Sequence, residues 1–403
     1  MKPVYIYDAI RSARTRAKDS GGLHDLTPQA LLAQLYESLR ERTGLDPASV
    51  GEIILGCVTQ HGEQAGNIAK TSALYAGWPT HIGGMTVSRF CSSGIDAISL
   101  AALKVAAGQE QAVIAGGVEM MSRVPMLADQ ARAFIDPKFA ARCQMLMMGS
   151  GADLIASLHG VTREQADTIA LESQQRAAHA REAGYFRSIV PIENPEKGIT
   201  VTADECIRGD ITLAQLGELP PAFAELGARG VDAAQLASYP ELTEISHIHT
   251  AGNSPAMCDG AAVLLVGDES LAAALGPPRA RITGAATASA DPLQVLSGCV
   301  SATERLLREQ ACSSDDIDLF ELHEAFAATT IKARQDLGID AGKLNVNGGV
   351  IALGHPMGAT GAIMAGTLLD ELERRNLNTG VVAASGAAGS GSALLLERYG
   401  NQP

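Results

Sequence analysis

The sequence predicts an α/β protein built from two related halves in which strands and helices alternate. Apolar runs of strand length alternate with helical patterns over residues 4–120, and the alternation returns over residues 277–403. Between the halves, residues 122–240 interrupt this pattern. In addition, Cys91 and His355 each lie in a turn that leads into a small-residue helix and then an apolar strand. The same unit therefore occurs twice, once with a thiol and once with an imidazole.

Each element of the first half has a local reason. Thr27-Pro28 is typical of a helix start, and leucines recur on one face of the helix that follows. Strand and helix then alternate up to the strand that ends at Cys91, so we expect a mainly parallel sheet with helices on both faces. The expected strands are residues 4–9, 50–58, 85–90 and 111–117, and the expected helices are residues 27–42, 67–76 and 98–107.

The middle of the chain reads as an insertion. One amphipathic helix is expected at residues 163–182, and the remainder consists of loops, which in such long excursions are commonly binding lids. A structural or oligomerisation appendage is the alternative. We therefore expect a first half of residues 1–121 plus 241–276, an inserted domain of residues 122–240 and a second half of residues 277–403. Within the returning core, strands are expected at residues 261–266, 279–288, 317–321 and 380–384, and helices at residues 292–310 and 362–374.

Composition limits the classes of function. The 403-residue chain is 46% hydrophobic and 19% charged, with a formal net charge of -14, which argues against non-specific nucleic-acid or anionic membrane binding. An anionic substrate stays possible, because it needs only a local site. The seven cysteines include no CxxC pair, so neither a disulfide framework nor a metal site is expected. With no signal-peptide pattern and no apolar run of about 18 residues, we expect a cytoplasmic protein.

Cys91 is the candidate nucleophile. It lies where free backbone N–H groups and the positive end of a helix dipole would converge, and both favour the thiolate. The alternative is a small buried hydrophobic residue. His355, in Gly354-His355-Pro356, would be the activating base, although a His-Pro pair in a glycine-rich turn can also be structural.

Together, these motifs resemble the thiolase family of acyl-CoA acyltransferases, in the subset with a His-Glu-Ala-Phe run. The resemblance covers nearly the whole chain and rests on Cys91, on Gly354-His355-Pro356 and on five further segments. These are residues 8–12, 115–122, 250–253 with 259–262, the run His323-Glu324-Ala325-Phe326 and the glycine-rich C-terminal strand. The resemblance implies a five-layered sandwich of two duplicated βαβαβαββ halves, a loop domain over the active site, and a homodimer or homotetramer.

The resemblance also implies residue roles. Cys91 would carry the acyl group and His355 would activate it. His323, through its ring N–H or a held water, would face the enolate thioester oxygen together with His355. A second oxyanion site would use the backbone N–H groups of Cys91 and Ala387. The family normally supplies a second cysteine as acid/base group, but Ser385 occupies that position here. An alcohol is a far weaker acid than a thiol.

Coenzyme A and acyl-CoA are expected as substrates, with no permanently bound cofactor. Candidate coenzyme A contacts are Thr250, Ser254 and Arg229. The methionines in residues 145–148 are candidates for an adaptable acyl pocket, with core packing as the alternative.

Three functions stay open at this point. The first is acyl transfer through a Cys91 thioester, either 3-ketoacyl-CoA thiolysis or acetyl-CoA condensation, as in fatty acid metabolism. The second is a thiolase-like enzyme that passes the acyl group to another acceptor or hydrolyses thioesters, because it lacks the usual cysteine. The third is a non-catalytic subunit that binds acyl-CoA or a partner.

Overall fold

The computed structural model describes residues 2–400 and shows two halves joined edge to edge. Within these residues ten strands form one continuous sheet, in the order β10-β11-β12-β9-β1-β8-β5-β3-β4, with β2 beside β8. Within the sheet, the strands of the two halves pair where Tyr5 and Ile6 of β1 lie opposite Arg281 and Ala280 of β9. The strands are β1 Tyr5–Arg11, β2 Thr15–Arg16, β3 Glu52–Gly56, β4 Gly83–Val87, β5 Ala112–Met120, β8 Cys258–Gly267, β9 Ala280–Ser289, β10 Leu319–Leu322, β11 Thr379–Ser385 and β12 Ser390–Arg398.

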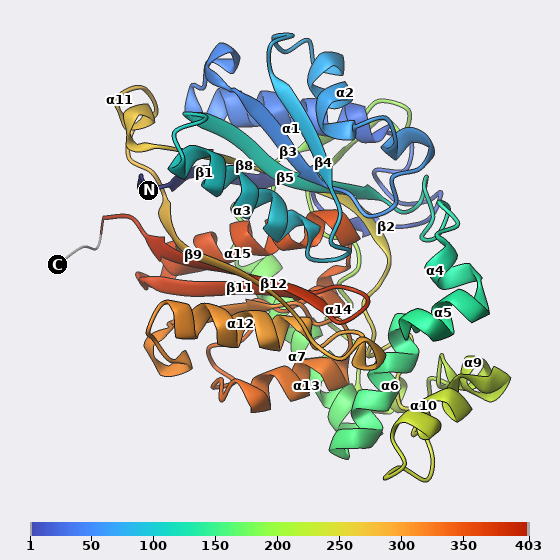
Figure 1. The fold of residues 1–403 in the computed structure, drawn as a ribbon. Coiled ribbons are helices and arrows are strands. Elements are labelled where there is room, and N and C mark those ends of the chain that lie inside the picture. The colour runs from blue at the N-terminus through green and yellow to red at the C-terminus, as the bar shows by residue number, and fades with distance from the viewer. Residues whose placement is uncertain (1, 401–403) are drawn as a thin grey trace.

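The helices complete five layers, as the resemblance implied (Figure 1). The outer layer beside the first half contains α1 and α2, and the outer layer beside the second half contains α12 and α13. Between the two parts of the sheet lie α3 and α15. These helices are α1 Pro28–Thr43, α2 Ile68–Tyr75, α3 Ser93–Ala106, α12 Gly298–Glu309, α13 Ala327–Asp336 and α15 Thr360–Arg375, with the shorter α11 Ala272–Leu275 and α14 Val350–Leu353.

The strand directions differ from the mainly parallel sheet that the alternation predicted. Strands β3, β4 and β5 are parallel, but β8 pairs antiparallel with both β5 and β1. In the second half only β10 and β11 are parallel. The reason is that β8 enters the sheet from the long insertion and β12 from a tight turn, so neither strand is reached through a crossover helix.

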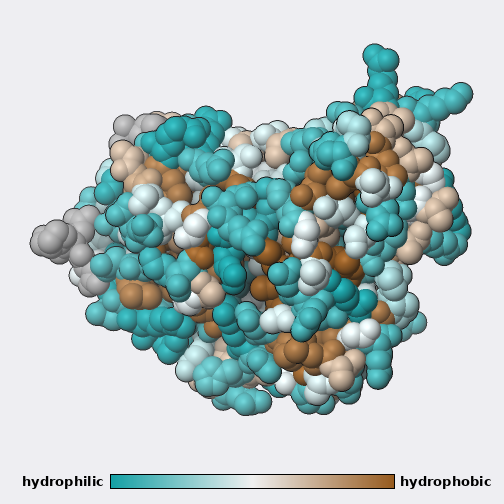
Figure 2. Space-filling model, turned by 90° about the horizontal axis from the view of Figure 1, so that it is seen from below, coloured by the Kyte–Doolittle hydropathy of each residue, from teal (hydrophilic) through white to brown (hydrophobic). Residues whose placement is uncertain are grey.

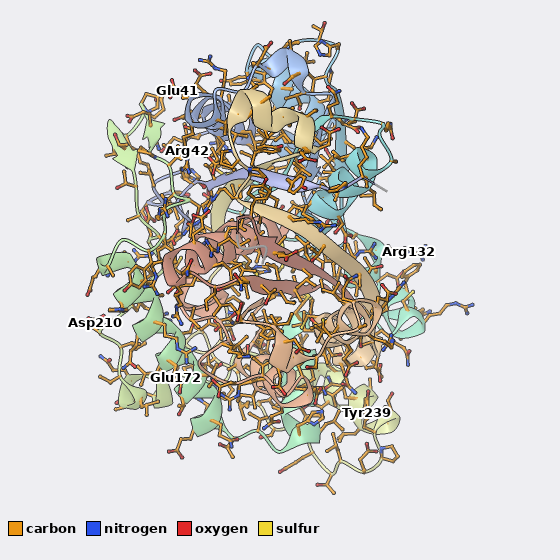
Figure 3. The ribbon with its side chains drawn as sticks, turned by 90° about the vertical axis from the view of Figure 1, so that its left-hand side faces the viewer. Glu41, Arg42, Arg132, Glu172, Asp210 and Tyr239 are labelled. Atoms are coloured by element: carbon orange, nitrogen blue, oxygen red, sulfur yellow. The ribbon has the colours of Figure 1, made fainter. Side chains whose placement is uncertain are left out.

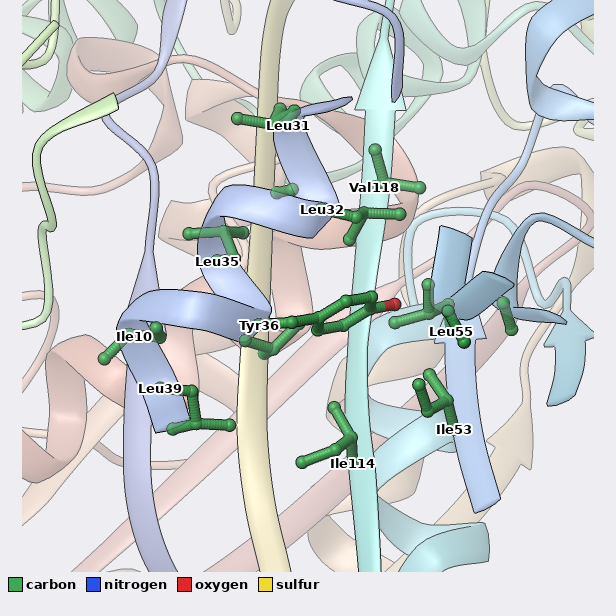
Figure 4. Close-up of a cluster of buried hydrophobic side chains, with 14 of the residues drawn as sticks. Ile10, Leu31, Leu32, Leu35, Tyr36, Leu39, Ile53, Leu55, Ile114 and Val118 are labelled. Atoms are coloured by element: carbon green, nitrogen blue, oxygen red, sulfur yellow. The ribbon is translucent and has the colours of Figure 1, made fainter. Parts of the chain in front are cut away.

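Helix α1 shows why the outer layers form where predicted. The Thr27 hydroxyl accepts the Ala30 N–H at 3.2 Å, which caps the helix, and Pro28 occupies its first position. Its leucines and Tyr36 are fully buried against the sheet (Figure 4). Burial of each such side chain stabilises the fold by roughly 1.5–3 kcal/mol.

The central helices α3 and α15 pack with almost no side chain between their first turns. A Cβ added to Gly94 would lie 2.7 Å from the Ala362 backbone nitrogen, and one added to Gly361 would lie 2.7 Å from that of Ile95. Only glycine allows such an approach. Because the two helix starts meet here, the turns that precede them also meet.

Residues 122–240, named the lid here, have most of their helices beside the second half, while residues 189–201 pack on the first half. The helix expected at residues 163–182 is present as α7 Arg163–Glu182, capped by Thr162 and Gln165. Figure 3 shows the lid residues Arg132, Glu172, Asp210 and Tyr239 at the periphery of the molecule. The other elements are α4 Arg132–Ile135, α5 Pro137–Cys143, α6 Met148–His159, β6 Ile192–Asn194, β7 Ile199–Val201, α8 Leu213–Gly217, α9 Ala224–Leu226 and α10 Asp232–Ser238.

The surface carries apolar residues in a dispersed pattern on the face shown in Figure 2, where hydrophobic residues form separate groups among hydrophilic ones. Among residues 2–400, none of the helices combines the length and the apolar character needed to span a bilayer.

Candidate active site

Cys91 lies in a strained turn between β4 and α3. Phe90 adopts a φ of 50°, a left-handed conformation that is uncommon for a bulky residue. The turn is held by the Ser92 N–H, which donates to the Arg89 carbonyl at 3.1 Å, and by the Ser93 N–H, which donates to the Phe90 carbonyl at 3.0 Å. The strain places the thiol of Cys91 at the start of α3.

His355 lies directly opposite Cys91. Its Nε2 is 3.0 Å from the Cys91 sulfur, and its Nδ1 is 2.7 Å from the Thr360 hydroxyl oxygen. The Thr360 hydroxyl donates to the Pro356 carbonyl at 3.2 Å, so it accepts from His355 Nδ1. The Nε2 atom therefore carries the lone pair and accepts the Cys91 S–H.

Burial keeps this pair neutral. It raises the pKa of Cys91 to about 12, with a further contribution from the Glu119 carboxylate, while the backbone N–H of Cys91 itself acts in the opposite direction. Burial also lowers the pKa of His355 well below its usual value, and His323 and Arg14 reinforce that effect. The backbone N–H at the helix start favours the thiolate, as expected, but desolvation outweighs it. Proton transfer to His355 must accompany nucleophilic attack.

His323 stands beside His355 at the end of β10. The two ring centroids are 4.4 Å apart. His323 Nδ1 donates to the Ser385 carbonyl at 3.1 Å, whereas its Nε2 is buried without a hydrogen-bond partner. The Cys91 sulfur and one nitrogen from each ring lie within 4.8 Å of one another. Burial lowers the pKa of His323 to about 4.

Ser385 ends β11 and is adjacent to this cluster through its backbone only. Its side chain is fully buried, and its hydroxyl oxygen accepts the Cys299 N–H at 2.9 Å at the start of α12. The residues that line the two cavities at Cys91 do not include Ser385. The hydroxyl thus faces α12, while the carbonyl holds His323.

Two cavities meet at Cys91, and the larger has a volume of about 270 Å³. Their shared lining is Cys91, Met126, Met148 and Met357. The larger cavity is mostly apolar, with Phe223 from the lid and Phe326 from the second half. The lining is completed by Met121, Met147, Gly149, Ser254, Pro255, Met257, Leu296, His323, Ala325 and His355.

The smaller cavity, of about 150 Å³, contains the proposed oxyanion donor Ala387. Within residues 2–400 the Ala387 N–H has no hydrogen-bond acceptor, so it is available to a ligand. The cavity is otherwise lined by apolar groups, hydroxyls and one carboxylate. These residues are Val58, Thr59, Ser88, Phe90, Leu127, Asp129, Ala131 and Phe134.

Of the three candidate coenzyme A contacts, only Ser254 faces a cavity. Its buried hydroxyl has no partner, which suits a ligand contact. Thr250 is fully buried and its hydroxyl accepts the Gly252 N–H at 3.0 Å, within a turn. Arg229 is exposed on the lid and forms an ion pair with Glu225. Met147 and Met148 line the larger cavity, whereas Met145 is buried elsewhere.

Two residues that sequence reasoning did not single out hold the site together. Thr360 orients His355 through a hydrogen bond. The sequence signal for this role is a hydroxyl residue five positions after the histidine, where a helix begins. Glu119 is fully buried and accepts backbone N–H groups from Val58 at 2.9 Å and Gly358 at 2.9 Å. Its carboxylate therefore ties a loop of the first half to the histidine turn of the second. A lone acid in an apolar strand was the signal for this role.

Comparisons with known proteins place the chain. Family models for the N-terminal and C-terminal domains of thiolase match residues 4–238 and 276–398. The 3-ketoacyl-CoA thiolase of Aliivibrio fischeri is 39% identical over 407 residues, covering 99% of this chain and 100% of the relative. The 3-oxoadipyl-CoA/3-oxo-5,6-dehydrosuberyl-CoA thiolase of Escherichia coli is 36% identical over 422 residues, with coverage of 99% and 100%. The acetyl-CoA acetyltransferase structure from Bacillus anthracis superposes with a TM-score of 0.86 at 34% identity, covering 99% of both chains. The chain belongs to the thiolase family of acyl-CoA acyltransferases.

Proposed function

We propose that this protein cleaves 3-ketoacyl-CoA with free coenzyme A, and runs the reverse acetyl-CoA condensation, through an acyl thioester on Cys91. The observation that carries the proposal is the 3.0 Å contact between the Cys91 sulfur and His355 Nε2 where two cavities meet. The similarity to a 3-ketoacyl-CoA thiolase supports it. Retention of this contact argues against a non-catalytic subunit.

The first half-reaction follows from the geometry. The Cys91 thiol gives its proton to His355 Nε2 as the sulfur attacks the 3-keto carbon, and the free Ala387 N–H stabilises the oxyanion. The C2–C3 bond then breaks, which leaves the acyl group on sulfur and an acetyl-CoA enolate that must take up a proton. Coenzyme A finally accepts the acyl group, and Cys91 recovers its proton.

The cavities support a substrate with an uncharged, apolar acyl chain. We assign the larger cavity, with the unpartnered Ser254 hydroxyl, to the coenzyme A arm, and the smaller one to the acyl chain. Neither cavity is lined by lysine or arginine, and Asp129 would repel a terminal carboxylate. The protein should therefore resemble the 3-ketoacyl-CoA relative more than the 3-oxoadipyl-CoA relative in its substrate.

Steady-state thiolysis tests this function. Purified protein is given coenzyme A with 3-ketooctanoyl-CoA or with 3-oxoadipyl-CoA, and cleavage is followed by product analysis. We expect coenzyme A-dependent cleavage of the apolar substrate, with kcat/KM at least tenfold above that for the dicarboxylic one. Absence of cleavage for every chain length would contradict the proposal, and preference for 3-oxoadipyl-CoA would contradict the cavity assignment.

A second function, acyl transfer to another acceptor or thioester hydrolysis, is favoured only by the absence of a second cysteine, among the described residues, from the cavity linings. Among residues 2–400, Cys91 is the only cysteine that lines either cavity. An enzyme of this kind could transfer the acyl group to another acceptor, or hydrolyse it, without removing an α-proton. Acylation of Cys91 without cleavage of 3-ketoacyl-CoA would support this second function.

The assembly and location belong to the same proposal. Strand β4 forms one edge of the sheet and is only half-buried along its length, so it is suited to pairing within a homodimer or homotetramer. Light scattering on the purified protein tests the oligomeric state. A cytoplasmic location fits the bacterial relatives. The division into 1–121 plus 241–276, 122–240 and 277–403 is retained as a proposal, supported by the lid residues that line the larger cavity.

A further inference from the structure

The site raises a chemical problem that neither Cys91 nor Ser385 solves. Cleavage and condensation both need a group that exchanges a proton with C2 of the acetyl-CoA unit. The hydroxyl of Ser385 is bound to the Cys299 N–H and faces away from both cavities. No second cysteine among residues 2–400 lines these cavities. Ser385 and the other cysteines therefore leave the C2 proton without a base.

His323 is held in the tautomer that this task requires. A backbone carbonyl can only accept a hydrogen bond, so the 3.1 Å contact to the Ser385 carbonyl places the ring proton on Nδ1. The Nε2 atom of the neutral ring then carries a lone pair. It is buried, has no partner, and belongs to a residue that lines the larger cavity beside Cys91. A direct N–H donor role from Nε2 toward the enolate oxygen would need the opposite tautomer.

We propose that His323 Nε2 exchanges the C2 proton of the acetyl-CoA unit, in place of the second cysteine that this chain lacks. This inference rests on the proposed function. Ser385 then contributes its carbonyl, which fixes the ring of His323, rather than its hydroxyl.

The step balances in both directions. In condensation, the Nε2 lone pair takes a proton from C2, and the C–H electron pair becomes the enolate. The enolate carbon attacks the acyl carbon on Cys91, the C–S bond breaks, and Cys91 leaves as a thiolate. The proton on Nε2 then passes to the Cys91 sulfur, which restores both groups. The Cys91 sulfur and one nitrogen of each ring lie within 4.8 Å of one another, which places the three groups at one reacting centre. Thiolysis reverses each step.

The basicity of His323 is low but sufficient. A pKa of about 4 is comparable to that of a carboxylate, a type of group that enzymes use as general base against carbon acids. The protonated ring would also be stabilised by the enolate that forms beside it.

His355 is the competing base, because its Nε2 is also a lone-pair nitrogen. In the unacylated protein that atom accepts the Cys91 S–H at 3.0 Å and is needed for acylation, whereas in the acyl-enzyme the thiol is consumed and the atom is free, so experiment must tell the two bases apart. A change at His355 should therefore impair both half-reactions, whereas a change at His323 should impair only the exchange at C2.

The test uses His323→Asn and His323→Ala in the full-length protein. An asparagine amide can donate a hydrogen bond but cannot take up a proton near neutral pH. Comparing His323→Asn with His323→Ala therefore distinguishes a hydrogen-bond donor role of His323 from a role as base. Each variant is mixed with acetyl-CoA in D₂O. Intact mass reports the acetyl group on Cys91, and mass spectrometry of the recovered acetyl-CoA reports deuterium in its methyl group.

We expect C2 exchange to fall by about 10²–10⁴-fold more than Cys91 acylation in both variants. Three results would overturn the inference: retained exchange in both variants, which indicates His355; retained exchange in His323→Asn alone, which indicates a donor role; or exchange absent from an acylating wild type. A wild type that forms no adduct would instead contradict the proposed function.

Discussion

Cys91 and His355 each precede a helix that is followed by a buried strand, α3 and β5 in one half, α15 and β11 in the other. The first half holds its reactive residue one position before the helix cap, in a turn strained at Phe90. The second half places His355 further from α15 and fixes its ring through Thr360, a residue of that helix. The same unit therefore positions a small nucleophile by backbone strain and a larger base by a side-chain hydrogen bond.

The ends of the two strands also differ. Near the end of β5, Glu119 reaches across to the Gly358 N–H of the other half, whereas Ser385 at the end of β11 turns its hydroxyl away. The two halves thus share one scaffold. They differ in the side chains near the ends of β5 and β11, which have different contacts in each half.

The largest expected effect comes from removing the base of the second half. We expect His355→Asn to lower the rate of Cys91 acylation by about 10²–10⁴-fold, because the neutral thiol then has no acceptor for its proton. Thr360→Val should lose less, since the imidazole remains but its ring is no longer held. The acylation rates of both variants are measured by quenching the reaction at successive times and recording the mass of the intact protein. Equal losses in the two variants would show that ring orientation matters as much as basicity.

Asp204 tests how the lid joins both halves. It forms buried ion pairs with Arg11 at 2.8 Å and Arg14 at 3.4 Å, and Arg14 also donates to the Gly354 carbonyl beside His355. Burial raises the pKa of Asp204, but attraction to the two arginines outweighs it and leaves the pKa below its usual range. Asp204→Asn should reduce the free energy of unfolding by about 3–5 kcal/mol, measured by denaturant titration. Glu225→Gln, in an exposed ion pair, is the control and should change it little.

His323 predicts a pH dependence of stability. Its pKa is about 4 in the folded protein against an ordinary value of 6.5, so the unfolded chain binds more protons between these values. Stability from this group is therefore complete above pH 6.5 and falls by roughly 3 kcal/mol as the pH drops to 4. His323→Asn should flatten that part of the curve of unfolding free energy against pH. An unchanged curve would contradict the neutral, buried ring.

The glycine contact between α3 and α15 tests whether the two turns depend on each other. Gly94→Ala and Gly361→Ala should each destabilise the fold by about 1–3 kcal/mol and slow acylation, because the added Cβ forces the helix starts apart. Gly217→Ala in α8 is a matched control, since a Cβ there would meet nothing within 4 Å. Thermal unfolding and intact mass report the two effects. Destabilisation without slower acylation would show that the contact between α3 and α15 stabilises the fold but does not position Cys91 and His355.

The smallest expected effect concerns Ser385. Ser385→Ala leaves the Cys299 N–H without its acceptor, so we expect a loss of about 1–3 kcal/mol in unfolding free energy. Exchange at C2 should fall far less than in His323→Asn. A loss as large as that of His323→Asn would assign the proton transfer to the hydroxyl.

Much of this arrangement could be predicted from the sequence. The alternation of strands and helices and the helix α7 follow from local patterns, the five layers follow from the family resemblance, and the approach of Cys91 to His355 follows from the repeated unit. The antiparallel strand β8 could not be predicted locally, because its partners lie far away in the chain. The neutral state of Cys91 depends on burial, which no motif reports. The tautomer of His323 and the direction of the Ser385 hydroxyl depend on single hydrogen bonds formed only in the folded protein.

The most direct test of the account is the mass of the intact protein after brief exposure to 3-ketooctanoyl-CoA without free coenzyme A. We expect one added hexanoyl group, two carbons shorter than the substrate chain, which peptide mapping locates on Cys91 and coenzyme A releases. The Cys91→Ala variant should show no such addition. A wild-type protein that stays unmodified, or an acyl group on another residue, would contradict the central claim.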